Sequence, residues 1–151
     1  MYIRLLIALH QSYNIKLYII LSIQTFYSNI LEISRSIPLD VLIEKFTVNW
    51  NVSEDIVIHC WCGVSRSMAT ATYLMCKKNI KDIDNNIKYI RSIAPHANPN
   101  KLLIKLFEKK LNIEGEITKS FEKYPYTQTY DCSSNFAPIT LFNYEEMINF
   151  K

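Results

Sequence analysis

The sequence predicts an α/β fold, with a mostly parallel central sheet flanked by helices, as a single domain of residues 1–151. Short apolar runs rich in Ile, Leu and Val alternate with segments in which apolar residues recur at helical spacing. Hydrophobic residues make up 49% of the chain and charged residues 21%, a composition typical of globular proteins. No repeat, low-complexity segment or linker marks a boundary between domains.

The first third of the chain is expected to supply strands. Residues 2–9, 17–23 and 25–33 are apolar runs rich in Ile, Leu and Tyr. The first two are too short to span a bilayer, which takes about 20 apolar residues, and the polar residues 10–14 interrupt the pattern of a signal peptide. We therefore expect buried strands here, no membrane association and a location in a reducing cytoplasm.

From Pro38 onward the spacing of apolar residues changes to that of helices. A first helix is expected over about 39–46, with Ser36 as its cap and Pro38 near its first turn. Residues 55–59 then form a short β-branched run of the kind that is buried in a parallel sheet. Helices are predicted over 66–78, with buried positions that include Met68, Ala71, Thr72 and Met75, and over about 83–93, with Ile83, Ile87 and Ile90 on one face.

The predicted elements become shorter toward the C-terminus. Asn98 is expected to cap the next helix and Pro99 to be its first residue. Its buried positions would be Leu102, Leu103, Leu106 and Phe107. A last amphipathic turn contains Ile117 and Phe121, and from Pro125 onward the chain is aromatic and irregular.

The strongest functional signal is residues 59–67, His-Cys-Trp-Cys-Gly-Val-Ser-Arg-Ser, between the predicted strand 55–59 and the predicted helix 66–78. Backbone N–H groups of such a loop can turn inward toward the oxygens of a dianion, and the helix N-terminus adds partial positive charge. Gly63 lies where the loop must turn tightly. The pattern predicts a phosphate-binding loop that consists of Trp61, Cys62, Gly63, Val64, Ser65 and Arg66.

The residue types in this loop also indicate a nucleophile. Arg66 presents a planar fork to two phosphate oxygens. The same positive field favours a thiolate, so we expect the pKa of Cys60 to lie below the usual value of about 8.5. His59 would orient the loop, Ser67 would donate a hydrogen bond to the Cys60 sulfur, and Ser65 would brace the loop.

On these residues the chain resembles the cysteine-based protein tyrosine phosphatases, in particular the compact dual-specificity kind and a bacterial group of protein tyrosine phosphatases. The pattern His-Cys-Trp-x-Gly-x-Ser-Arg-Ser carries the resemblance, and residues 91–104, with Arg91 followed by Pro99-Asn100 and an apolar helix, carry a second part of it. It covers about 38–111, and the segment before Cys60 is short for the family, which implies a truncated or rearranged N-terminal part. In such enzymes the Asn after Pro helps to fix the phosphate loop, a role that the resemblance gives to Asn100.

The resemblance implies hydrolysis of phosphomonoesters without a metal or cofactor, through a cysteinyl-phosphate on Cys60. Phosphorylated proteins or small phosphomonoesters would be the substrates. Enzymes of this kind use an Asp about thirty residues before the cysteine as general acid, and that window contains Glu32 but no Asp. Glu32 is therefore the candidate acid and Asp40 a further one. Alternatively there is no competent acid, and the chain is a weak or inactive phosphate-binding protein.

The remaining cysteines allow other interpretations. Cys62 stands where the bacterial group has a small residue, so it is expected to fill the loop; alternatively it could trap an oxidised Cys60 as a disulfide. Neither a disulfide framework nor a zinc site is expected, because His96 and Cys132 are isolated and no second Cys cluster occurs. The net charge of +3 permits an anionic substrate but does not indicate a nucleic-acid binder.

Overall fold

The structure is a computed structural model of the chain. It describes residues 17–20, 43, 47, 48, 50, 56–60, 62–131 and 133–151, with residues 17–20 and 59 described through their backbone alone. The predicted strands at 2–9 and 25–33, and most of the predicted helix at 39–46, lie outside these residues. Within that helix, Ile43 is described as helical and buried.

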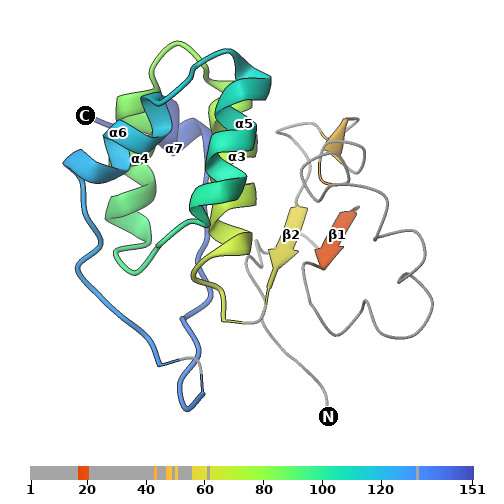
Figure 1. Cartoon of the computed structure of the whole chain (residues 1–151), viewed down its shortest axis with the longest axis vertical. Helices are drawn as coiled ribbons and strands as arrows, with labels where there is room; N and C mark the ends of the chain where they lie inside the picture. Colours follow the sequence, from red (N-terminus) through yellow and green to blue (C-terminus); the bar gives the residue numbers. More distant parts are fainter. Residues whose placement is uncertain are drawn as a thin grey trace.

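Two strands and five helices are described, and the helices all lie on one side of the strands (Figure 1). β1 and β2 pair in parallel, with Leu17 opposite Ile56 and Ile20 opposite His59. This confirms parallel strands within the predicted runs 17–23 and 55–59, while a wider sheet stays a prediction. The bounds are β1 Leu17–Ile20, β2 Ile56–His59, α3 Arg66–Lys78, α4 Ile83–Ile93, α5 Lys101–Leu111, α6 Glu116–Lys123 and α7 Tyr144–Ile148.

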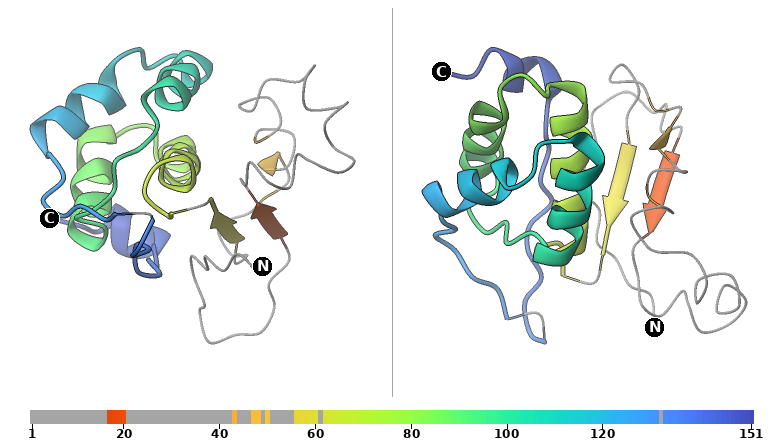
Figure 2. Two further views of the ribbon diagram at one scale, coloured as in Figure 1. Left: turned by 60° about the horizontal axis from the view of Figure 1, so that its bottom comes forward. Right: turned by 45° about the horizontal axis from the view of Figure 1, so that its top comes forward.

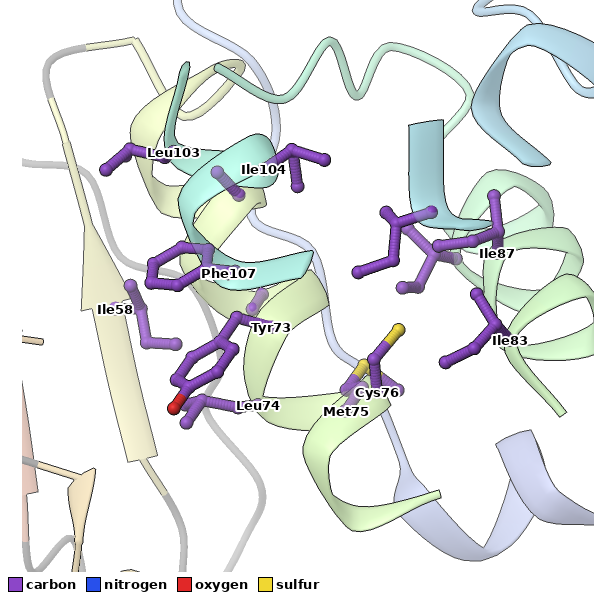
Figure 3. Close-up of a cluster of buried hydrophobic side chains, with 14 of the residues drawn as sticks. Ile58, Tyr73, Leu74, Met75, Cys76, Ile83, Ile87, Leu103, Ile104 and Phe107 are labelled. Carbon is purple, nitrogen blue, oxygen red and sulfur yellow. The ribbon is translucent and has the colours of Figure 1, made fainter. Parts of the chain in front are cut away.

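α3 is the central helix of the described part and follows β2 directly (Figures 1 and 2). All its residues from Ser67 to Cys76 are buried. On one side Tyr73 stacks on Phe107 of α5, with ring centroids 4.2 Å apart, and Ile58 of β2 points toward the same two rings (Figure 3). A helix enclosed on several sides in this way is apolar or small around most of its circumference, which is why the sequence over 67–76 contains no charged residue.

α4 packs on the other side of α3 and confirms the predicted apolar face. Ile83, Ile87 and Ile90 are all buried, and the first two lie opposite Met75 and Cys76 of α3 (Figure 3). Asp82 caps the helix, because its side chain accepts a hydrogen bond from the backbone N–H of Asn85 at 3.2 Å. The core of the described part therefore forms around α3, from β2, α4 and α5 together with Ile117 of α6 and Met147 of α7.

The start of α5 was predicted wrongly. Asn98 is not the cap and Pro99 is not the first helical residue; the cap is Asn100, whose side chain accepts from the N–H of Leu103 at 3.0 Å. The buried positions also differ in part from the prediction: Leu103, Ile104 and Phe107 are buried, Leu106 is partly buried and Leu102 is 67% exposed. The segment 98–100 lies against the start of α3, where the N–H groups of Asn98 and Asn100 donate to the Val64 and Ser65 C=O groups, and the helix begins only after these contacts.

The last two helices are held by polar contacts as well as by apolar burial. Asp84 of α4 accepts hydrogen bonds from Ser120, Lys123 and Tyr124 at the end of α6, at distances from 2.7 to 3.0 Å. Residues 125–131 and 133–143 are irregular, as expected, but α7 at the C-terminus was not predicted. Asn143 caps it by accepting from the N–H groups of Glu145 and Glu146. Among the described helices, none has the length and apolar character that crossing a membrane requires.

Candidate active site

β2 delivers Cys60 to the N-terminus of α3. Val57 and Ile58 are buried in the core, so the strand fixes where its last residues emerge. The chain then makes a loop, here called the Cys60 loop (residues 60–66), and enters α3 at Arg66. The Cys60 side chain is 2% exposed. A strand, a short loop and a helix N-terminus thus surround one thiol.

Hydrogen-bond donors point at the Cys60 sulfur. The Ser67 Oγ lies 3.2 Å from Sγ. Burial favours the neutral thiol and so raises the pKa of Cys60, but hydrogen bonds to the sulfur outweigh that effect and lower the pKa below its ordinary value of 9.0. These bonds come from the Ser67 hydroxyl and from the backbone N–H groups of Ser67, Gly63 and Ser65.

This geometry can hold a thiolate and, beside it, an anion. Because the N–H groups of Gly63 and Ser65 face the sulfur, the inner surface of the Cys60 loop is lined with donors. Arg66 starts α3 and is partly exposed, and its backbone C=O accepts from the Thr70 hydroxyl at 3.0 Å. The positive end of the helix dipole adds to the same field.

Gly63 allows the loop to turn inward. Its φ of +80° lies in the left-handed region, where a side chain costs about 1–2 kcal/mol. The residue is also buried. A glycine at this position therefore fits the predicted need for a tight turn, and the sequence supplies one of its two glycines here.

The outward face of the Cys60 loop is held by backbone N–H groups from two other segments. Asn98 N–H donates to the Val64 C=O at 3.0 Å, and Asn100 N–H donates to the Ser65 C=O at 3.2 Å. From the C-terminal part of the chain, the Ala137 N–H donates to the Cys62 C=O at 3.2 Å. Carbonyls fixed outward leave the amides of the same peptides facing inward, so these contacts support the donor-lined surface.

Arg91 organises the segment that makes the first two of these contacts. Its Nη1 lies 2.7 Å from the Ala97 C=O, 3.3 Å from the Pro95 C=O and 3.4 Å from the Ala94 C=O. Its Nε donates to the Tyr124 C=O at 2.9 Å. Arg91 is part of the resemblance, but its role could not be predicted, because its acceptors are backbone carbonyls, which leave no trace in the sequence.

His96 is buried in the same segment, 2% exposed, and the edge of its ring meets the Tyr130 ring at a centroid distance of 5.4 Å. Neither ring nitrogen has a hydrogen-bond partner among the described residues. Burial, and secondarily the charge of Arg91, lower the pKa of His96 below 6.5. The imidazole is therefore neutral at neutral pH. The described residues contain no group of three His, Cys, Asp or Glu side chains that could hold a metal ion.

The structure brings together most of the predicted loop and leaves some predicted residues outside the description. Gly63, Val64, Ser65, Arg66 and Ser67 lie around Cys60, and Asn100 touches the loop through its backbone N–H while its side chain turns to α5. His59 is described only as the last residue of β2. Glu32, Asp40 and Trp61 lie outside the described residues.

Cys62 is where the expectation from the sequence is wrong. It is disulfide-bonded, whereas Cys60 and Cys76 are free thiols. Cys62 is therefore neither a simple thiol that fills the loop nor bonded to Cys60 in this structure. The spacing of the four cysteines gave no signal for this bond, because connectivity cannot be deduced from spacing alone.

Comparisons with known proteins agree with the site. The family model for the dual specificity phosphatase catalytic domain matches residues 13–111. A protein of Acanthamoeba polyphaga mimivirus, named "Putative tyrosine-protein phosphatase R622", is 34% identical over 77 residues, which cover 46% of this chain and 36% of that protein. This chain thus spans little more than a third of the curated relative that it matches. No solved structure matches the chain significantly. Since the family match covers more than half of the 151 residues and includes the whole Cys60 loop, the chain belongs to the dual specificity phosphatase family.

Proposed function

We propose that this chain hydrolyses phosphomonoesters without a metal, as an enzyme of the protein tyrosine and dual-specificity type. The observation that carries the proposal is the environment of Cys60, where a hydroxyl and three backbone N–H groups lower the pKa of a buried thiol. Burial alone would give an inert neutral cysteine, as it does at Cys76, whose pKa burial raises to about 12. The contrast between two buried cysteines of one chain indicates a nucleophile at Cys60.

The substrate phosphate would bind inside the Cys60 loop. The N–H groups that point at the Cys60 sulfur would donate hydrogen bonds to the phosphate oxygens. Arg66 would hold two of those oxygens through its guanidinium. Trp61, Cys62, Gly63, Val64 and Ser65 would contribute their backbone, and His59 would orient the loop. Asn100 supports it through the hydrogen bond to the Ser65 C=O.

In the first step the Cys60 thiolate attacks phosphorus in line with the leaving oxygen. A bond forms between sulfur and phosphorus, the bond from phosphorus to the ester oxygen breaks, and that oxygen takes a proton from a general acid or from water. We propose Glu32 as the acid, on the sequence pattern alone. Without an acid the same site would turn over esters of acidic phenols better than alkyl esters, because a phenolate leaves more easily without a proton.

In the second step water attacks the cysteinyl-phosphate and the thiolate leaves. Ser67 is placed to assist here, because its hydroxyl lies 3.2 Å from Sγ and can donate to the sulfur as negative charge returns to it. The proton lost by the attacking water goes to the base form of the general acid or to solvent. The products are inorganic phosphate and the regenerated thiolate.

The substrates that fit this site are phosphorylated proteins, phosphotyrosine-like groups among them, or small accessible phosphomonoesters. Family membership supports this class. A phosphatase-like protein that binds phosphate without hydrolysing it has the same loop, so turnover must be measured directly.

The test is turnover of an aryl phosphate by the full chain, compared with the Cys60→Ser variant. We expect turnover by the native chain and none above background by Cys60→Ser, because a neutral hydroxyl in place of a thiolate is a poor nucleophile. If both proteins show only the background rate and both bind inorganic phosphate, the proposed enzymatic activity is contradicted, and the chain is a phosphate-binding protein instead.

A further inference from the structure

The chain after α6 returns to the Cys60 loop. We call residues 125–143 the C-terminal strap; it runs from the end of α6 past the loop and on to α7 (Figure 2). At its start, the N–H groups of Thr127 and Gln128 donate to the Pro95 C=O at 2.9 and 3.4 Å. Farther along, Ala137 donates to the Cys62 C=O. The strap thus contacts both the loop and the segment that supports it.

The strap has few buried anchors of its own. Ala137 and Thr140 are buried, and Phe142 packs against the cluster of Met68, Ala94 and Ala97. Most of its other described side chains are exposed, including Tyr126, Phe136, Ile139 and Leu141. A segment with little buried surface opens at low free-energy cost unless another bond holds it.

A covalent bond is present at the contact with the loop. Cys62, whose C=O accepts from Ala137, is disulfide-bonded. The sequence has four cysteines, and two of them, Cys60 and Cys76, are free. Within the chain this leaves Cys132, which belongs to the strap by sequence and lies outside the described residues.

We propose that the C-terminal strap is a positioning element of the Cys60 loop, fastened to it by a Cys62–Cys132 disulfide, and that a dithiol reductant releases it. The inference rests on the proposed phosphate site. With the bridge intact, the strap holds the Cys62 peptide from outside, as Asn98 and Asn100 hold the Val64 and Ser65 carbonyls. Once the bridge is cut, a backbone hydrogen bond remains at that point, and the loop is less well organised before phosphate binds.

The redox step is a thiol–disulfide exchange. A dithiol gives two electrons and two protons to the bridge, both cysteines become thiols, and the dithiol becomes a disulfide. A small disulfide such as oxidised glutathione reverses the step. Cys60 takes no part in it, because it is a free thiol in the bridged structure. In a reducing cytoplasm, where persistent disulfides are rare, such a bridge would act as a redox-sensitive fastening.

The experiment uses full-length Cys60→Ser protein, so that reductant and oxidant cannot act on the nucleophile. The affinity for inorganic phosphate is measured by calorimetry before and after reduction with dithiothreitol. We expect the Kd to rise about fivefold or more on reduction, since preorganisation is lost, and to recover after oxidised glutathione. Circular dichroism of the same samples checks that the helices remain folded. Cys60→Ser/Cys62→Ser protein is the matched control; it should bind as weakly as reduced protein and ignore the reductant.

The outcomes separate the two proposals. Equal affinity before and after reduction would overturn the strap inference and leave the phosphate site standing. No phosphate binding in either state would overturn the site and, with it, the inference. Cys60→Ser/Cys132→Ser protein should bind phosphate as weakly as Cys60→Ser/Cys62→Ser protein. If a non-reducing peptide map of the Cys132 variant still shows Cys62 in a disulfide, Cys132 is not its partner and the strap inference is refuted.

Discussion

Substitution of Ser67 by Ala tests how the thiolate at Cys60 is stabilised. The Ser67 hydroxyl lies 3.2 Å from the Cys60 sulfur and is one of the groups that lower the pKa of that thiol. Its removal leaves the backbone N–H groups in place. We therefore expect the pKa of Cys60 to rise while the loop keeps its shape.

The size of the rise follows from the energy of one hydrogen bond to a charged group. Such bonds contribute about 1.5–3 kcal/mol, and one pKa unit corresponds to about 1.4 kcal/mol. If the hydroxyl bonds mainly to the thiolate form, its loss should raise the pKa of Cys60, and at a pH below that pKa the thiolate fraction should fall by at least about tenfold. Ser67 is fully buried, so water cannot easily replace the lost donor.

The assay is the rate of alkylation of Cys60 by iodoacetamide as a function of pH, with the modified peptide identified by mass spectrometry. The other cysteines interfere little. Burial raises the pKa of Cys76 to about 12, and Cys62 is disulfide-bonded as long as no reductant is added. The midpoint of the rate profile reports the pKa of the Cys60 thiol.

A matched control lies in the same helix. Thr72 is buried, and its hydroxyl has no hydrogen-bond partner among the described residues. Thr72→Val removes a hydroxyl without removing a bond to the sulfur, so the midpoint should stay at the native value. A Ser67→Ala midpoint equal to the native one would refute the role of the hydroxyl and leave the backbone N–H groups as the cause of the lowered pKa.

Three further predictions concern the support of the loop and the stability of the fold. Gly63→Ala and Gly115→Ala each force a side chain to φ +80° and should each cost about 1–2 kcal/mol of unfolding free energy. Calorimetry should show weaker phosphate binding for Gly63→Ala alone, and an equal loss of phosphate affinity in both variants would count against the loop geometry. Arg91→Met removes four backbone contacts and should lower kcat/KM for an aryl phosphate by at least about tenfold, which is a loss of about 1.4 kcal/mol of transition-state stabilisation. The control Asp84→Asn loosens α6 at the same Tyr124 and should change stability but not kcat/KM. The pKa of His96 is lowered in the fold, so the unfolded chain binds a proton first as pH falls below 6.5, and native protein should lose stability on acidification through this window. Urea unfolding at pH 7.5 and 5.5 should show a smaller loss of stability for His96→Phe than for the native protein. An equal loss in the two proteins would exclude His96 as the cause.

Local patterns in the sequence predicted the elements that carry the site. The apolar spacing of 66–78 and 83–93 gave the bounds of α3 and α4 as the structure has them. The Cys60-x5-Arg66 spacing indicated a thiol at the end of a strand and a helix N-terminus beside it, and both are present. These features depend on residues near in sequence, so a single chain suffices to predict them.

Features that depend on distant backbone were not predictable. The start of α5 was placed two residues early, because the segment before it lies against the start of α3, where Asn98 and Asn100 donate to the Val64 and Ser65 C=O groups. Arg91 bonds to backbone carbonyls, which every residue provides. The disulfide at Cys62 left no mark in the spacing of the four cysteines. Asn98 and Arg91 each have a partner far along the chain, Val64 for the first and Tyr124 for the second.

Formation of a covalent bond between Cys60 and phosphorus is tested by a rapid acid quench during turnover of an aryl phosphate, followed by peptide mass mapping. We expect a phosphoryl group on the Cys60 peptide. The trapped fraction should be larger in Ser67→Ala, because loss of the hydroxyl slows departure of the thiolate in the second step. Native turnover with no phosphoryl group on Cys60 in either protein would contradict the account.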